Sequence, residues 1–180
     1  MERSRGEQFS GVVDDRYIYD LALDETAELP PIAELDLAAQ GPRCLANGDE
    51  VTIVAAGYST HLAMQAREQL QAAGMSAEVV DLRVLNPFDP TVVIQSVRKT
   101  RRLLVVDGGW RNSGFTAEVI ASVTERLEPG VLLDAPRRIT LPGAPAPASR
   151  VLEQIYYPTV EDVALAASEL ALAAPREATV

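Results

Sequence analysis

Hydrophobic positions along the chain alternate between short continuous runs and helical spacings. The run VTIVAAG, residues 51–57, is continuously apolar, which is typical of a strand buried on both faces of a sheet. Gly74 follows a helical repeat and can end that helix in a left-handed conformation. The repeat is carried by Leu62, Ala66, Leu70 and Ala73. This first unit is therefore a buried strand followed by a helix.

The same alternation continues to the end of the chain. Asp89 can cap a helix that has Pro90 at its first position, and Thr159 with Asp162 forms a capping-box arrangement before the last helix. Strands alternating with helices predict an α/β fold of three layers (αβα), an open and mostly parallel sheet covered on both faces. The predicted strands are 76–82, 102–107 and 137–142, and the predicted helices are 90–99, 115–127 and 160–173.

The first 47 residues lack this alternation of strand-like and helix-like patterns. We expect a disordered N-terminus over residues 1–10, because they are polar. Residues 11–47 begin with a short valine- and tyrosine-rich strand and continue as an acidic linker that two prolines interrupt. The folded domain is expected over residues 48–173, followed by a flexible tail over 174–180.

Composition narrows the function classes. The net charge is −10, from 26 acidic against 16 basic residues, which disfavours nucleic acid and anionic membrane surfaces as partners. The single cysteine, Cys44, permits no internal disulfide and fits a reducing compartment. The N-terminal ten residues lack the apolar core of a signal peptide. We expect a soluble, cytoplasmic protein.

The segment VVDGGWRNSGFTAEV, residues 105–119, joins a strand to a helix, and such junctions often carry the functional residues of α/β proteins. Gly108, Gly109 and Gly114 match neither GxGxxG nor a phosphate loop ending in Gly-Lys-Ser/Thr. Gly114 at a helix N-terminus could hold an anion, but a tight turn is the favoured reading. Trp110 is either a lid over the core or an interface anchor, and tryptophan followed by arginine is a common hot-spot composition.

Catalytic side chains are scarce. His61 is the only histidine, and no sequence feature links it and Ser59 to an acid as a triad. With one histidine in the chain and no lysine around Cys44, nothing in the sequence marks this cysteine as an activated thiolate. Arg137 and Arg138 could pair with carboxylates at an interface, although surface solvation is the favoured role. We predict no catalytic, cofactor-binding or metal-binding residue in this chain.

Three segments resemble the C-terminal domain of the transketolase superfamily, in particular the β subunit of thiamine-diphosphate-dependent 2-oxoacid dehydrogenases (pyruvate or branched-chain E1). GDEVTIVAAG resembles that domain's first strand, AEVVDLRVLNPFD resembles its EVIDLRTLxPxD segment, and VVDGGWRNSGFTAEV resembles its VVEEGxxxGGFGAEI segment. VVDDRYIYD resembles the last strand of the preceding pyrimidine-binding domain. In GAPAPAS, Ala144 and Ala148 depart from the family pattern GxDxPxPY.

The resemblance implies a cofactor that other chains bind. In such enzymes thiamine diphosphate lies between two other domains, one supplying a glutamate and the other a metal-binding Gly-Asp-Gly…Asn pattern. The chain contains no Gly-Asp-Gly, and it lacks nearly all of the glutamate-bearing domain. We therefore expect thiamine diphosphate and Mg²⁺ to be bound by partner chains in the assembled enzyme, and this chain to be inactive alone.

The implied partners are a chain with the pyrimidine-binding domain, an E1 α-like chain with the diphosphate-binding domain, and a lipoyl acyl-carrier E2. The expected role is assembly and docking as the separately encoded C-terminal subunit of a split enzyme. The expected interface residues are Gly109, Trp110, Arg111, Gly114 and Phe115. Two alternatives stay open: a non-catalytic binding or regulatory module that reuses the fold, and a fragment of a full-length β subunit.

Overall fold

The computed structural model describes residues 41–174, all of them in the unit Ala38–Val180. They form a five-stranded sheet in the order β1-β3-β2-β4-β5, in which only β1 runs antiparallel to its neighbour. The elements are β1 (Arg43–Ala46), β2 (Val51–Ala55), α1 (Tyr58–Ala72), β3 (Ala77–Asp81), α2 (Thr91–Thr100), β4 (Leu103–Trp110), α3 (Phe115–Thr124), β5 (Arg137–Leu141), α4 (Arg150–Tyr156) and α5 (Val160–Leu172). The α/β class and the mostly parallel sheet are confirmed.

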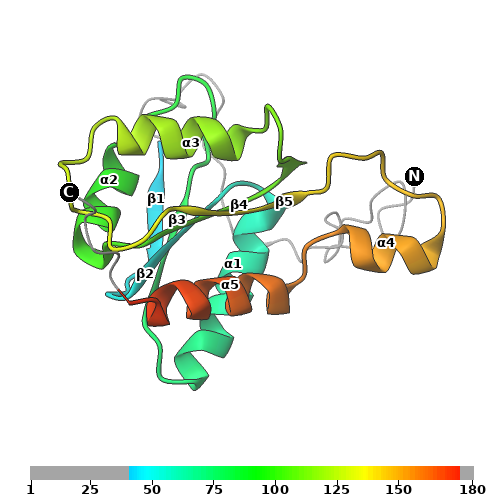
Figure 1. Cartoon of the computed structure of the whole chain (residues 1–180), viewed down its shortest axis with the longest axis horizontal. Coiled ribbons are helices and arrows are strands. Elements are labelled where there is room, and N and C mark those ends of the chain that lie inside the picture. Colours follow the sequence, from blue (N-terminus) through cyan, green and yellow to red (C-terminus); the bar gives the residue numbers. More distant parts are fainter. Residues whose placement is uncertain (1–40, 175–180) are drawn as a thin grey trace, which may run out of the picture. The chain divides into compact units, whose positions relative to one another are not determined.

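Two hydrophobic clusters hold the three layers together. Alternate residues of the central strand β2 point to opposite faces, so Ile53 joins one cluster and Val54 joins the other. The first cluster packs α1 and α5 against the sheet, and the second packs α2 and α3 against the opposite face. Figure 1 shows α3 on one side of the strands and α5 with α1 on the other. This arrangement explains why all five residues of β2 are buried.

Local signals in the sequence set several helix ends. Gly74, at φ +83°, follows α1 in the left-handed region, as predicted. The Asp89 carboxylate accepts a hydrogen bond from the Thr91 backbone N–H at 3.0 Å, but the N-cap residue of α2 is Pro90, one residue later than predicted. Thr159 and Asp162 form the predicted capping box at the start of α5.

Three parts of the domain differ from the sequence-based expectation. Residues 43–46, placed in the linker, form β1, which pairs antiparallel with β3. Residues 150–156, where no element was expected, form the helix α4. β4 runs on through Gly108 and Gly109 to Trp110 rather than ending at Asp107, so the tight turn predicted at the glycines begins later.

The remaining predictions concern residues outside the described range. The disordered segment 1–10, the strand and most of the linker in 11–47, and most of the tail 174–180 lie there. Within residues 41–174, no helix has the length and apolar character needed to cross a membrane.

Candidate assembly site

The residues that the sequence singled out meet where β4 passes into α3. β4 ends at Trp110, whose partner in the neighbouring strand β5 is Leu141. Four residues later, Gly114 precedes the first turn of α3. A Cβ atom on Gly114 would lie 1.9 Å from the Trp110 carbonyl oxygen, so only glycine permits this close return of the chain. The loop 111–113 is therefore closed tightly on the end of β4.

Two hydrogen bonds hold the end of β4 and the start of this loop. The Asp107 carboxylate accepts a hydrogen bond from the Gly109 backbone N–H at 3.0 Å. Across the sheet edge, the Arg138 guanidinium donates to the Arg111 carbonyl oxygen at 3.1 Å. Arg138 therefore bonds to a backbone oxygen, in addition to the solvation that the sequence favoured.

The predicted interface residues are close together, but they do not all face the surface. Trp110 is 54% exposed and Arg111 is exposed, so the tryptophan is not a lid over the core. Phe115 instead packs against the second hydrophobic cluster, with its ring 5.6 Å from that of Phe88 in an edge-on arrangement. The two glycines shape the backbone, which leaves Trp110 and Arg111 as the side chains available for contact.

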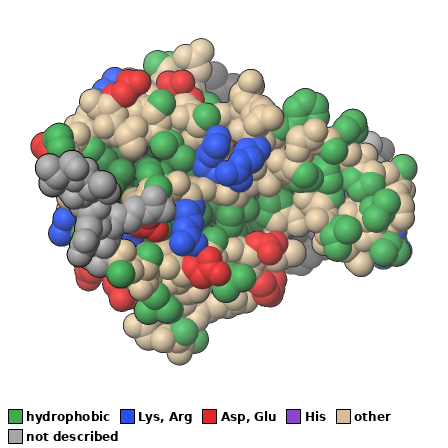
Figure 2. Space-filling view, in the orientation of Figure 1, with side chains coloured by type: hydrophobic (Ala, Val, Ile, Leu, Met, Phe, Trp, Pro, Cys, Tyr) green, Lys and Arg blue, Asp and Glu red, His purple; other side chains and the backbone are tan. Residues whose placement is uncertain are grey.

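Sequence reasoning missed a second exposed apolar surface. Helix α4 leaves Val151 72% exposed, Leu152 49% exposed and Ile155 80% exposed, and we call these three residues the α4 patch. The hydroxyl of Tyr156 donates to the Ala144 carbonyl oxygen at 2.6 Å, which ties α4 to the segment before it. Figure 2 shows hydrophobic side chains gathered over the α4 end of the domain. Exposed apolar groups in such number on one short helix are typical of an interaction surface.

The described residues do not fit thiamine diphosphate and Mg²⁺. Gly108 and Gly109 lie in a strand, and the Gly109 N–H is already bonded to the Asp107 carboxylate, which would repel a phosphate. Within residues 41–174 no group of three or more His, Cys, Asp or Glu side chains is placed to hold a metal ion. The Gly109 N–H at the end of β4 is therefore not free to bind a diphosphate.

The structure also places the other two candidate side chains, His61 and Cys44. His61 lies in the first turn of α1, with its ring 5.8 Å from that of Tyr58. Cys44 lies in β1, where burial first, and then the negative charge of Glu78, raises the pKa of its thiol. A thiol with a raised pKa stays protonated, so it is a poor nucleophile at neutral pH.

An ion pair between β3 and α2 lies near Cys44. Glu78 on β3 is 4% exposed and pairs with Lys99 at the end of α2. Burial raises the pKa of Glu78, but hydrogen bonds from Lys99, Ser96 and the Gly48 N–H together hold it below the usual range. The hydrogen bond to Glu78 raises the pKa of Lys99. The pair joins β3 to α2, so we expect it to stabilise the packing of this helix on the sheet.

Together, the fold and the site define a three-layer α/β domain that leaves Trp110 and the α4 patch exposed. The family described as the transketolase C-terminal domain matches residues 43–163, and the chain belongs to that family.

Curated relatives match the same part of the chain. One is the mitochondrial pyruvate dehydrogenase E1 component subunit beta of Caenorhabditis elegans, 42% identical over 117 residues that cover 64% of this chain and 33% of the relative. Another is the acetoin:2,6-dichlorophenolindophenol oxidoreductase subunit beta of Bacillus subtilis (strain 168), 38% identical over 125 residues that cover 68% of this chain and 36% of the relative. The matched region thus spans about a third of each relative's length.

A solved structure gives the same fold. A split-gene transketolase, described as an inactive beta4 tetramer, superposes with a TM-score of 0.63 and 26% sequence identity. The superposition covers 72% of this chain and 42% of that chain. The resemblance inferred from the three sequence segments is therefore confirmed at the level of the family and the fold.

Proposed function

We propose that this chain is the C-terminal, β-type subunit of a thiamine-diphosphate-dependent 2-oxoacid dehydrogenase or transketolase-like enzyme divided among several chains. Its contribution is assembly and partner docking. The assembled enzyme decarboxylates a 2-oxo acid and transfers the resulting acyl or ketol unit. The subunit does not catalyse the reaction on its own.

The relatives support the enzyme class. Both curated relatives are named as β subunits of oxidoreductases, and the solved neighbour is described as a split-gene transketolase. An E1 β subunit implies an α-type chain that carries the diphosphate-binding domain. The neighbour's description shows that a transketolase can be divided between genes, and we propose that the pyrimidine-binding domain of the present enzyme is on a separate chain. A lipoyl acyl-carrier E2 completes the proposed set of partners.

The observation that carries the assembly role is the exposure of large apolar side chains around one end of the sheet. Trp110 is 54% exposed and Ile155 is 80% exposed, and each has an arginine close in sequence, Arg111 or Arg150. Tryptophan and arginine are enriched among residues that dominate binding energy. A contact through Trp110, Arg111 and the glycine-shaped loop explains why this loop is closed so tightly.

The proposed division of the enzyme among several chains also decides which chains bind the cofactor. We propose that thiamine diphosphate and Mg²⁺ bind on the partner chains; within residues 41–174 no group of three or more His, Cys, Asp or Glu side chains is placed to hold the metal ion. Isolated chain should therefore give no thiamine-dependent decarboxylation.

Co-expression tests the proposal. The chain is expressed with the chains of its source genome that carry the pyrimidine-binding and diphosphate-binding domains, and the mixture is separated by size exclusion. The proposal predicts co-elution and thiamine-dependent decarboxylation that requires this chain. Elution as a lone species, with activity indifferent to its omission, would instead support a non-catalytic module.

Paired variants locate the contact. Trp110→Ser should weaken co-elution strongly, since truncation of a tryptophan anchor costs 2 kcal/mol or more, about thirtyfold in affinity. Leu172→Ser removes a 75% exposed apolar side chain at the far end of α5 and serves as the matched control. Equal effects of the two substitutions would remove Trp110 from the interface.

A further inference from the structure

A groove follows the open edge of the sheet. β5 is the last strand in the order, and among the described strands its one neighbour is β4. Beside it lies a groove of about 440 Å³, with one wall formed by residues 138–143 and the other by residues 155–158 and Asp162. β5 therefore offers unpaired backbone groups along a surface depression. Figure 1 looks onto this edge, with β5 in front of the other strands.

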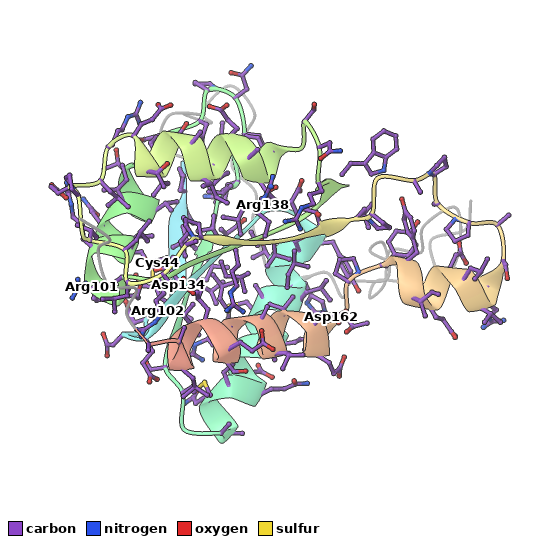
Figure 3. All side chains as sticks on the ribbon, viewed as in Figure 1. Cys44, Arg101, Arg102, Asp134, Arg138 and Asp162 are labelled. Atoms are coloured by element: carbon purple, nitrogen blue, oxygen red, sulfur yellow. The ribbon has the colours of Figure 1, made fainter. Side chains whose placement is uncertain are left out.

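The groove carries positive charge on one wall. Arg111 and Arg138 both line it, and Figure 3 shows Arg138 on β5 and Asp162 at the start of α5. Arg137 is already paired with Glu169 at 2.8 Å, and the Asp162 carboxylate accepts from Thr159 in the capping box. Two arginines and one carboxylate, Asp162, line the groove, so the charge that a partner meets is positive on balance, on a chain whose net charge is −10.

The floor and outer wall of the groove are apolar. Ile139 and Leu141 come from β5, and Ile155 and Tyr156 come from the end of α4. Ile155 also belongs to the α4 patch, so the groove continues into that exposed surface. Figure 2 shows hydrophobic side chains between the basic and acidic groups at this edge. The chemistry suits a ligand that alternates apolar and acidic groups.

The groove is too open for a small molecule. Sites for small ligands bury 70–90% of the ligand surface. Here several lining residues are themselves exposed, among them Arg111, Pro142, Gly143 and Ile155. An extended polypeptide is a better fit, because it can pair its backbone with the strand edge while its side chains alternate between the groove and solvent.

We propose that the β5 edge binds an extended segment of a partner polypeptide in which acidic and apolar residues alternate. Backbone hydrogen bonds between the partner segment and β5 supply affinity, and ion pairs between carboxylates of the segment and the side chains of Arg111 and Arg138 supply specificity. The two arginines also disfavour pairing with segments that lack acidic residues. The inference rests on the proposed assembly role and names the chemistry of the segment that docks.

A defined peptide probes the groove. A fluorescein-labelled decapeptide of alternating valine and glutamate is titrated with the full-length chain at low salt, and binding is followed by fluorescence anisotropy. Arg111→Glu and Arg138→Glu should each weaken binding at least tenfold. Arg111 is the cleaner site, since its exposed side chain holds no strand in place, whereas Arg138 bonds to the Arg111 backbone.

Two controls separate groove binding from general attraction. Arg43→Glu makes the same charge change on the exposed face of β1, the strand at the opposite edge, and should change affinity less than twofold. A valine–lysine peptide should bind at least tenfold more weakly than the glutamate peptide. Equal effects of Arg43→Glu and Arg111→Glu, or equal binding of the two peptides, would overturn the proposal.

Backbone methylation tests the strand pairing itself. N-methylation of all glutamates, or of all valines, blocks the N–H groups on one or the other edge of the peptide strand. At least one of the two methylated peptides should lose binding, and unchanged binding of both would contradict edge pairing.

The peptide-binding result and the co-expression result can fail independently of each other. Recovery of the multi-chain enzyme with no peptide binding to the groove would leave the proposed function standing and remove this inference. Failure of co-expression would remove the proposed function, whatever the peptide does.

Discussion

Substitution of Gly114 by alanine is the sharpest structural perturbation of the assembly loop. The added Cβ would lie 1.9 Å from the Trp110 carbonyl oxygen and 3.1 Å from the Trp110 carbonyl carbon. Ordinary contacts begin near 3.4 Å, so the end of β4 or the start of α3 has to move by more than 1 Å. Both groups are backbone, which leaves no flexible side chain to absorb the shift.

The magnitude follows from the cost of overpacking. Forced backbone shifts of this kind cost about 1–3 kcal/mol. For a chain of this size that corresponds to a fall in Tm of roughly 2–12 °C, at about 2–4 °C per kcal/mol. Displacement of Trp110 should also weaken assembly with the partner chains, since its side chain is the proposed anchor.

Gly108 provides the matched control. It lies two residues before Trp110 in the same strand, and a Cβ there meets nothing within 4 Å. Gly108→Ala should change the free energy of unfolding by less than about 1 kcal/mol, and it could stabilise the strand slightly. Urea unfolding followed by circular dichroism measures both variants, and Trp110 fluorescence reports the loop. Equal stability and equal fluorescence of Gly114→Ala and the wild type would refute the reasoning.

Three further predictions concern the free energy of unfolding at pH 7, measured by urea unfolding. Lys99→Met should lower it by about 2 kcal/mol, because the buried Glu78 carboxylate loses its cation, whereas Glu78→Gln should lower it by only about 1 kcal/mol, since the half-exposed Lys99 can return to water. Equal losses for the two variants would contradict this asymmetry. The Glu78 pKa is lower in the folded state, so its contribution to stability is complete above its ordinary pKa of about 4.5 and is lost as the pH falls through the lowered value; an unchanged acid limb in Glu78→Gln would count against it. Thr159→Ala removes the capping box and should cost about 1 kcal/mol, measured in the same way, with Ser149→Ala, which lacks a side-chain cap bond, as the control.

The sequence predicted the elements that bury a periodic apolar face. β2 was evident because it is apolar at almost every position, and α1 was evident because Leu62, Ala66 and Leu70 repeat on one face. β1 was missed because four residues at a sheet edge, mostly exposed, carry no periodicity. α4 was missed because Val151 and Ile155 face solvent, so their spacing does not mark a buried stripe within the domain.

The candidate site was predictable only in part. Trp110 and Arg111 stood out by residue type and by the glycines around them, and the structure exposes both side chains. The groove could not be found in this way, since Arg111, Arg138 and Asp162 lie far apart in the sequence and meet only through strand pairing and the return of α5. Phe115 was named among the expected interface residues, and the structure packs its ring against the second hydrophobic cluster.

A titration of this chain into its partner chains tests the central claim most directly. The pyrimidine-binding and diphosphate-binding chains are held at fixed concentration with thiamine diphosphate and Mg²⁺, and the rate of 2-oxo acid decarboxylation is measured as this chain is added. The account predicts negligible activity without it and a saturable rise to a stoichiometric end point, which Trp110→Ser shifts to higher concentration. A rate that is the same with and without this chain would contradict its role as a subunit.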